Sequence, residues 1–211
     1  MTVYTEKPAV NLREELASLR NQGGYQEQQF YFDSLVTNGT FDADTNWIKG
    51  TDWSISGGVA NHTTTSSAAI YQTQSVELGK RYQVSVDITF NGAGTAYWRL
   101  GNTTNLGTVM STTQTNTQVL TAAATGAYIG IFTNANITID NISVFEVDAN
   151  DDVIHTMPKG WKPKDVFEDG LLQREGSAHD YEMVHDGFDY FVKPTVAPSA
   201  TTQTCVIGVK A

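Results

Sequence analysis

The stretch Tyr82–Phe90, YQVSVDITF, alternates apolar and polar side chains without a break. A period of two residues places every apolar side chain on one face of a β-strand and every polar one on the other. Its β-branched and aromatic residues suit the half-buried surface of a sheet. Because one strand cannot bury such a face alone, the flanking sequence must supply partner strands.

The flanking sequence from 35 to 147 contains further short apolar segments separated by turns rich in Gly, Asn and Thr. We expect strands, in chain order, in LVTNG, TDWSISGGVANH, AAIYQTQSVEL, TAYWRLG, TNTQVLTA, GAYIGIFTN and ITIDNISVFEV, with loops at FDADTNW and NTTNLGT. Turn signals that recur every roughly 8–14 residues predict an antiparallel β-sandwich. In the last segment, Ile137 and Ile139 share one parity and Ile142 and Val144 the other, which predicts a bulge at Asp140-Asn141.

The same region resembles a known family of domains. The opening LVTNGTFDADTNW, the middle ELGKRYQVSVDITF and the closing ITIDNISVFEV are similar to carbohydrate-binding modules of the family 4/9/22 type. The resemblance covers residues 35–147 and implies a jelly-roll sandwich. Such modules occur in polysaccharide-degrading enzymes and, in degenerate form, in phage virion proteins, and many keep the shell but lose the ligand.

Residues 1–34 are predicted to form an arm with a short helix. Asn11 is a helix N-cap candidate, a leucine stripe follows at Leu12, Leu16 and Leu19, and Gly23-Gly24 ends the pattern. A helix of about twelve residues is marginal alone in water. The stripe must therefore dock, either onto its own domain or onto a neighbouring subunit.

Residues 148–211 are predicted to form a linker and a small β-module. Pro158 and Pro163 argue against regular structure in the linker. The pairs Asp169-Gly170 and Asp186-Gly187 predict hairpins over 166–172 and 181–192, and 205–209 reads as a closing strand. The pattern resembles a small module of phage tail fibres. A unit of this size has marginal stability, so docking or oligomerisation is expected to support it.

Composition narrows the functional classes. The net charge is −10, and no basic stripe exists to bind nucleic acid or an anionic membrane. No apolar run approaches the roughly 18 residues of a membrane span, and the first residues lack the apolar core of a signal peptide. The single cysteine, Cys205, excludes an internal disulfide.

Aromatic side chains are the candidates for a ligand site. Sugar rings stack on aromatic rings while polar neighbours hold the hydroxyls. The candidate ligand-binding residues are Trp53, Tyr71, Tyr97 and Arg99. Trp98 shares parity with Leu100 and should lie in the core, so Tyr97 and Arg99 point the other way. The alternative is that these aromatic residues are all core residues.

Two acidic residues are candidates for a metal site. In the family that the sandwich resembles, a structural calcium is often held near the first and last strands, which implies Asp42 and Asp140 as ligands. The alternative is that Asp140 hydrogen-bonds across the bulge and Asp42 caps a turn. No other cofactor is expected.

Catalytic motifs are missing from the sequence. It contains no nucleophile elbow, no Cys–His arrangement, no phosphate-binding glycine loop and no zinc-protease motif. The sequence therefore predicts a protein that is not an enzyme.

Together these features predict a bacteriophage virion structural protein, assembled in the host cytoplasm. It would act in capsid decoration, the neck, the tail or a fibre, through contacts with other virion proteins. By analogy with appendage proteins, a homo-oligomer, especially a trimer, is expected. The alternative function is a glycan-binding module that recognises a receptor on a cell surface.

Overall fold

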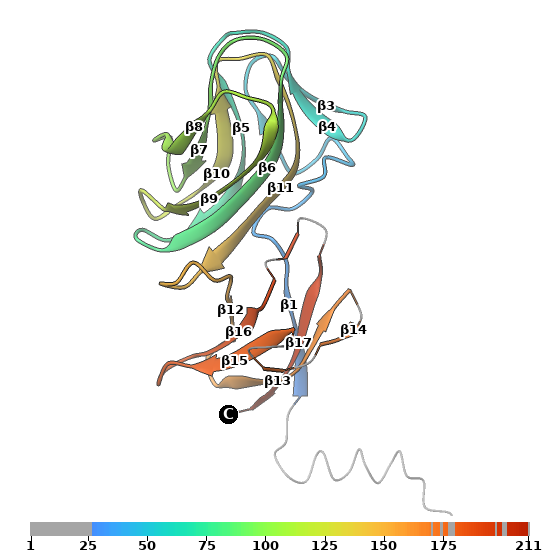
Figure 1. Ribbon diagram of the computed structural model, residues 1–211, viewed down its shortest axis with the longest axis vertical. Helices are drawn as coiled ribbons and strands as arrows, with labels where there is room; N and C mark the ends of the chain where they lie inside the picture. Colours follow the sequence, from blue (N-terminus) through green and yellow to red (C-terminus); the bar gives the residue numbers. More distant parts are fainter. Residues whose placement is uncertain are drawn as a thin grey trace, which may run out of the picture.

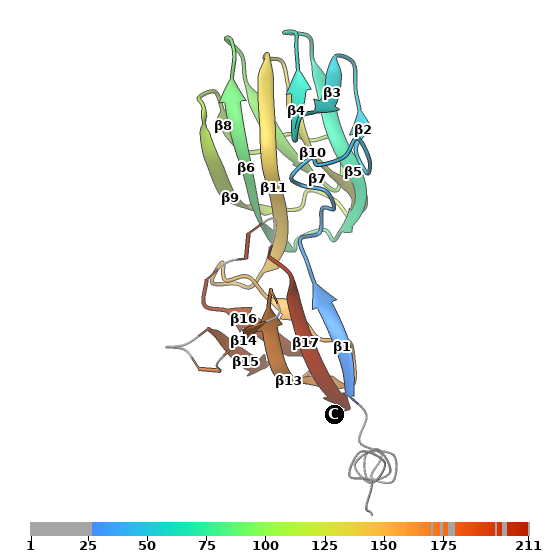
Figure 2. The same ribbon diagram turned by 90° about the vertical axis from the view of Figure 1, so that its right-hand side faces the viewer.

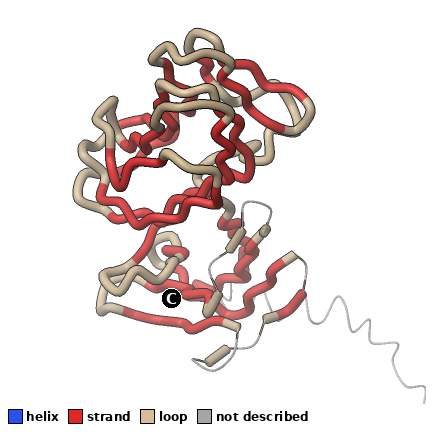
Figure 3. Tube along the Cα trace, turned by 45° about the horizontal axis from the view of Figure 1, so that its top comes forward, coloured by secondary structure: helices blue, strands red, loops and turns tan. Residues whose placement is uncertain are grey.

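The computed structural model describes residues 27–169, 171–173, 175–176, 180–196, 198–199 and 202–210. All regular elements in these ranges are β-strands, β1 to β17 (Figure 3). No helix among the described residues is long and apolar enough to cross a membrane. The helix predicted to start at Asn11 lies outside the described ranges. The strands form two bodies stacked along the long axis of the molecule (Figure 1).

The larger body is an antiparallel β-sandwich of the jelly-roll type, which confirms the predicted fold class. One five-stranded sheet, here called the β5 sheet, has the order β2-β5-β10-β7-β8. Its strands are β2 (Ile48–Lys49), β5 (Ala68–Val76), β10 (Gly126–Thr133), β7 (Ala96–Leu100) and β8 (Leu106–Met110). The other, the β6 sheet, has the order β3-β4-β11-β6-β9. Its strands are β3 (Trp53–Ser56), β4 (Val59–His62), β11 (Ile137–Val147), β6 (Arg81–Phe90) and β9 (Gln114–Thr121).

The core lies between these two sheets. Strand β6 turns Tyr82, Val84, Val86 and Ile88 inward, as its alternation predicts, and all four are buried. Trp98 and Leu100 of β7 meet them from the β5 sheet and are 0% exposed, which confirms the predicted orientation of that strand. Burial of aliphatic and aromatic side chains of this kind stabilises the fold by about 1.5–3 kcal/mol each.

The predicted bulge in β11 is present. The pairing between β11 and β6 shifts between Asp140 and Ser143, so that Ile139 and Ile142 both reach the core despite opposite parity. The amide of Ile142 donates to the carbonyl of Gly39 at 2.9 Å. A Cβ on Gly39 would lie 2.0 Å from the carbonyl oxygen of Ile142, so this close approach requires glycine.

Two local predictions in the sandwich were wrong. Residues 35–39 do not form a strand, because the backbone takes a positive φ at Asn38 (52°) and again at Phe41 (53°). The segment instead follows β11, with the amide of Leu35 donating to the carbonyl of Val144. The predicted loop NTTNLGT ends earlier than expected, since β8 begins at Leu106 and pairs with β7.

The smaller body, here called the β-module, contains two sheets. One has the order β1-β17-β13-β14 and the other β12-β16-β15. Their strands are β1 (Glu27–Phe32), β17 (Thr204–Lys210), β13 (Trp161–Glu168), β14 (Leu171–Leu172), β12 (His155–Thr156), β16 (Tyr190–Pro194) and β15 (Tyr181–His185). The predicted hairpins and closing strand are confirmed: β13 pairs with β14, β15 pairs with β16, and β17 ends the described chain.

Strand β1 corrects the predicted arm. Residues 27–32 were assigned to an arm before the sandwich, yet they pair antiparallel with β17 along six registered positions, from Glu27 with Val209 to Phe32 with Thr204. The sandwich is therefore inserted between the first strand of the β-module and the rest of it (Figure 2). Local sequence patterns could not indicate this, because the two paired segments are separated by the whole sandwich and most of the β-module.

Strand β13 corrects the prediction for Pro163. The residue lies within the strand, at a position where the pairing with β17 shifts between Pro163 and Asp165. Proline is tolerated at a bulge or on an edge, where no ladder bond from its nitrogen is needed. Strand β14 pairs only with Phe167 and Glu168, so β13 is an edge strand at Pro163.

Candidate functional site

The outward surface of the β5 sheet carries a group of aromatic side chains. Alternation along β7 turns Tyr97 and Arg99 away from the core, and along β10 it does the same for Tyr128 and Phe132, since Ile129 and Ile131 are buried. Ile48 and Tyr71 face the same way. The aromatic face is defined here as Ile48, Tyr71, Tyr97, Arg99, Tyr128 and Phe132.

Strand register brings these residues together. Gly130 of β10 lies opposite Tyr71 of β5 on one side and opposite Arg99 of β7 on the other. Ile48 of β2 extends this row beyond Tyr71. A Cβ on Gly130 would come within 2.5 Å of the Tyr71 Cβ, so the row requires glycine at its centre. The row therefore has side chains at both sides and, in the middle, a buried glycine without a side chain.

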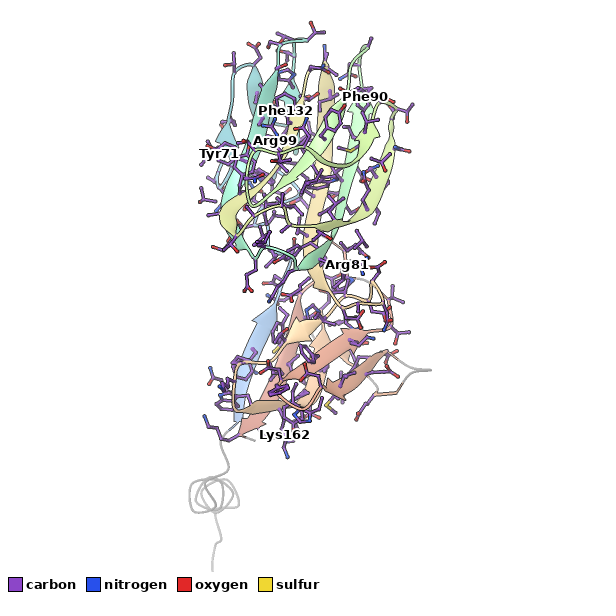
Figure 4. The ribbon with its side chains drawn as sticks, turned by 90° about the vertical axis from the view of Figure 1, so that its left-hand side faces the viewer. Tyr71, Arg81, Phe90, Arg99, Phe132 and Lys162 are labelled. Atoms are coloured by element: carbon purple, nitrogen blue, oxygen red, sulfur yellow. The ribbon has the colours of Figure 1, made fainter. Side chains whose placement is uncertain are left out.

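Ring contacts fix the positions of the side chains. Tyr71 and Tyr128 stack with ring centroids 4.3 Å apart and an interplanar angle of 13°. The Arg99 guanidinium carbon lies 3.8 Å from the centroid of the Phe132 ring. Figure 4 shows Tyr71, Arg99 and Phe132 on the same flank of the sandwich. Tyr97 lies opposite Phe132 on the neighbouring strand and continues the aromatic surface.

Hydrogen bonds hold Arg99 and Tyr128 in place. Arg99 donates through Nε to Oδ1 of Asn105 at 2.8 Å. Burial raises the pKa of Tyr128, and a hydrogen bond and charge attraction from Arg99 oppose that rise only in part. The Tyr128 hydroxyl therefore stays protonated at neutral pH. A ligand on the aromatic face would meet a neutral hydroxyl beside a fixed cation.

Trp53 does not belong to this site, and its prediction as a ligand contact is corrected. It lies on β3 in the opposite β6 sheet, is 7% exposed and packs against His62 with ring centroids 5.2 Å apart. Trp53 shares parity with Ile55, and both face the core. The other three predicted ligand residues, Tyr71, Tyr97 and Arg99, lie on one surface.

Sequence reasoning missed Ile48, Tyr128 and Phe132. The alternation in GAYIGIFTN does indicate that Tyr128 and Phe132 point away from Ile129 and Ile131. The alternation does not show that these residues lie beside Tyr71 and Arg99. They do so because β10 lies between β5 and β7 in the folded sheet. Strand order, rather than side-chain direction, assembles the face.

Asp42 and Asp87 lie close enough to Asp140 for their charges to raise its pKa. The Asp140 carboxylate accepts a hydrogen bond from the Asn141 amide at 2.7 Å, and Asp42 accepts one from the Thr40 hydroxyl at 2.6 Å. The calcium site and its hydrogen-bonding alternative both stay predictions. In the part of the chain that the structure describes, no group of three or more His, Cys, Asp and Glu side chains is placed to hold a metal ion.

Replacing Asp140 by asparagine is expected to stabilise the protein slightly at pH 7. Desolvation raises the pKa of Asp140, and the charges of Asp87 and Asp42 raise it further against the Asn141 hydrogen bond. A raised pKa means that the charged form is disfavoured in the folded state, so the cost appears as the pH rises through that pKa and is absent well below it. The carboxyl is partly exposed, so the gain should stay below about 1 kcal/mol.

Thermal melts of wild type and Asp140→Asn at pH 7 and pH 3 check this. We expect the variant to have a higher Tm than wild type at pH 7 and the same Tm as wild type at pH 3. A wild-type Tm that rises with added calcium, and does not rise in the variant, would instead support the predicted calcium site.

Comparisons with known proteins give structural likenesses only. No family model matches the sequence, and no curated protein matches it either. Among solved structures, the N-terminal cellulose-binding domain of a Cellulomonas fimi β-1,4-glucanase is similar over 54% of this chain and 97% of its own, at 19% identity and a TM-score of 0.40. A C-terminal family 6 carbohydrate-binding module from Zobellia galactanivorans is similar over 56% and 98%, at 12% identity and a TM-score of 0.35.

A variant of a family 29 carbohydrate-binding module is similar over 56% of this chain and 92% of its own, at 15% identity and a TM-score of 0.36. These likenesses are too distant to transfer a ligand or a binding residue. A function must therefore be argued from the aromatic face itself.

Proposed function

We propose that this protein is a non-catalytic carbohydrate-binding module whose ligand lies on the aromatic face of the β5 sheet. The observation that supports this most is the stacked pair Tyr71 and Tyr128 beside Arg99 on Phe132, on a surface rather than in the core. Apolar rings with polar tips suit the C–H faces and hydroxyls of sugars.

The polar groups beside the rings support the same proposal. The hydroxyls of Tyr71, Tyr97 and Tyr128 and the guanidinium of Arg99 can donate to and accept from sugar hydroxyls. The rings are partly exposed and already fixed by contacts with one another, so little side-chain freedom is lost on binding. A rigid, amphipathic surface of this kind binds an extended chain rather than a deeply buried small molecule.

Replacing Tyr71 or Tyr128 by alanine is expected to weaken glycan binding roughly 30-fold, about 2 kcal/mol, because each substitution removes one ring and frees its stacking partner. Tyr97→Ala should cause a smaller loss, since Tyr97 lies at the margin of the face. A glycan array followed by calorimetry on the best ligand measures these effects.

Phe188→Ala is the matched control. Phe188 is 89% exposed on the β-module, away from the β5 sheet, so its removal deletes an aromatic ring without touching the face. Equal affinity in wild type, Tyr71→Ala and Tyr128→Ala, or no binding to any glycan, would contradict the proposal.

Assembly into a virion is a second candidate function, and one observation favours a structural role of this kind. Large apolar side chains are exposed on the β-module, with Leu171 at 71%, Leu172 at 61% and Val196 at 79%. Exposed apolar side chains of this size suit contacts with another subunit. Mass analysis of purified phage particles tests the virion role, and absence of the chain from all particles would refute it.

A further inference from the structure

Charged residues are distributed unequally between the two sheets of the sandwich. The strands of the β5 sheet contain two cations, Lys49 and Arg99, and no Asp or Glu. The strands of the β6 sheet contain three carboxylates, Asp87, Asp140 and Glu146, and one cation, Arg81. In a chain with a net charge of −10, a sheet without a carboxylate stands out. Its outward surface is therefore the one least repulsive to an anion.

Of the two cations in the strands of this sheet, Arg99 is the one that forms no ion pair with a carboxylate among the described residues. Lys49 forms a salt bridge with Asp44. Within the described ranges, no salt bridge is formed by Arg99, whose neighbours are the Phe132 ring, the Asn105 amide and the Tyr128 hydroxyl. A guanidinium has five N–H donors in a planar fork. These neutral contacts use some of the donors and leave the charge uncompensated.

The neighbours of Arg99 fix its plane as well as its position. Stacking on Phe132 sets the orientation of the guanidinium, and the Nε bond to Asn105 prevents rotation about the end of the side chain. A fixed planar fork matches the two oxygens of a carboxylate, whereas hydroxyl recognition does not require a charge. Tyr71 lies across Gly130 from Arg99 and stacks on Tyr128, so the pair presents ring surface beside the guanidinium.

We infer that the ligand is an acidic glycan that contains uronic acid, with its carboxylate on Arg99 and its sugar rings on Tyr71 and Tyr128. This inference rests on the proposed carbohydrate-binding function and narrows it to one ligand class. Arg99 sets the specificity of the site, because it is the group that distinguishes a uronate from the corresponding neutral sugar.

Matched pairs of ligands test the inference. The probes are oligogalacturonides, glucuronoxylan and hyaluronan fragments, each beside its carboxyl-reduced or methyl-esterified neutral form. Keratan sulfate, which carries sulfate but no uronic acid, separates sulfate from carboxylate. Titration calorimetry at two salt concentrations measures the affinities of the full chain. We expect at least one uronate to bind roughly 10- to 100-fold more tightly than its neutral form, as removal of a charged hydrogen bond predicts. The advantage should shrink at high salt.

Variants of Arg99 test whether the preference for uronates over neutral glycans depends on this side chain. Arg99→Gln should remove the preference for the uronate, because affinity for the uronate should fall far more than affinity for its neutral form, which loses only a hydroxyl contact. Arg99→Lys keeps the charge but loses the planar fork, so it should recover only part of the preference. Arg81→Gln is the matched control, because Arg81 lies on the β6 sheet beside Asp151, far from the aromatic face (Figure 4).

The outcomes separate the two proposals. A wild type that binds neutral glycans as tightly as acidic ones overturns the assignment of Arg99 and leaves the carbohydrate-binding function standing. A wild type that prefers sulfated chains over all uronates also overturns the carboxylate assignment. Binding to no glycan of either kind overturns both. If Arg99→Gln does not fold, the wild-type ratio between each uronate and its neutral form decides the question without it.

Discussion

Replacing Phe30 and Phe32 together by alanine is expected to unfold the β-module and leave the sandwich folded. Phe30 is partly buried against the core of the β-module and meets Trp161 edge-on, with ring centroids 5.2 Å apart. Phe32 stacks on His155 at 5.2 Å. Loss of a buried Phe costs about 3–5 kcal/mol, and these partly buried rings should cost about 4 kcal/mol together. A module of this size has little more stability than that.

Limited proteolysis with mass analysis measures the effect. In the double variant we expect rapid cleavage after residue 150 and a resistant fragment that spans the sandwich. Gln28→Ala is the control, since Gln28 lies on the same strand with an exposed side chain. A single melting transition at the wild-type temperature in the double variant would show that β1 is dispensable, and would argue against the inserted arrangement.

Acidification from pH 6.5 to pH 4 is expected to cost the protein roughly 3 kcal/mol of stability through His155. The side chain is 4% exposed, and burial lowers its pKa from 6.5 to about 4. The unfolded chain takes up a proton below about pH 6.5, whereas the folded protein stays neutral there down to about pH 4. The stabilising contribution is therefore complete above pH 6.5 and is lost as the pH falls through that window.

His155 lies where the two bodies meet, so acid should act on their junction. Its ring stacks on Phe32 of the β-module and meets Phe145 of the sandwich edge-on. Its Nε2 is buried without a hydrogen-bond partner in the described part of the chain. A cavity of about 190 Å³ beside it is lined by Asp33, Glu146 and Thr156 among others. Protonation would place a charge among rings, with no contact in place to compensate it.

Denaturation in urea at pH 7.5, 5.5 and 4 measures the loss. His155→Leu should abolish most of the slope with pH, since no proton is taken up at that position. His185→Gln is the matched control, because His185 is exposed at a hairpin and stacks on Tyr190. A pH dependence equal in wild type and His155→Leu would assign the acid sensitivity to other groups.

Much of the fold follows from local patterns in this sequence. The alternation in Tyr82–Phe90 predicted which side chains of β6 are buried, and the parity change around Asp140 predicted the bulge. The two Asp-Gly pairs predicted the hairpins of the β-module. Each of these depends on residues within a few positions of one another, where backbone geometry translates sequence directly into direction.

The site was predictable only in part. Parity in TAYWRLG placed Tyr97 and Arg99 outside and Trp98 inside. The same reasoning, applied to Trp53, places it on one side of its strand with Ile55, and the structure buries both. Tyr128 and Phe132 were visible as outward-facing residues but not as neighbours of Tyr71 and Arg99.

The sequence by itself determined the strands, their buried sides, the bulge and the tight turns, because these follow from the two-residue repeat and from local backbone preferences. Tertiary structure alone decided that β10 lies between β5 and β7, which creates the aromatic face, and that β1 pairs with β17 across the inserted sandwich. The physical reason is that strand pairing uses backbone hydrogen bonds that are the same for every residue. Partner choice therefore depends on how all buried faces fit together at once.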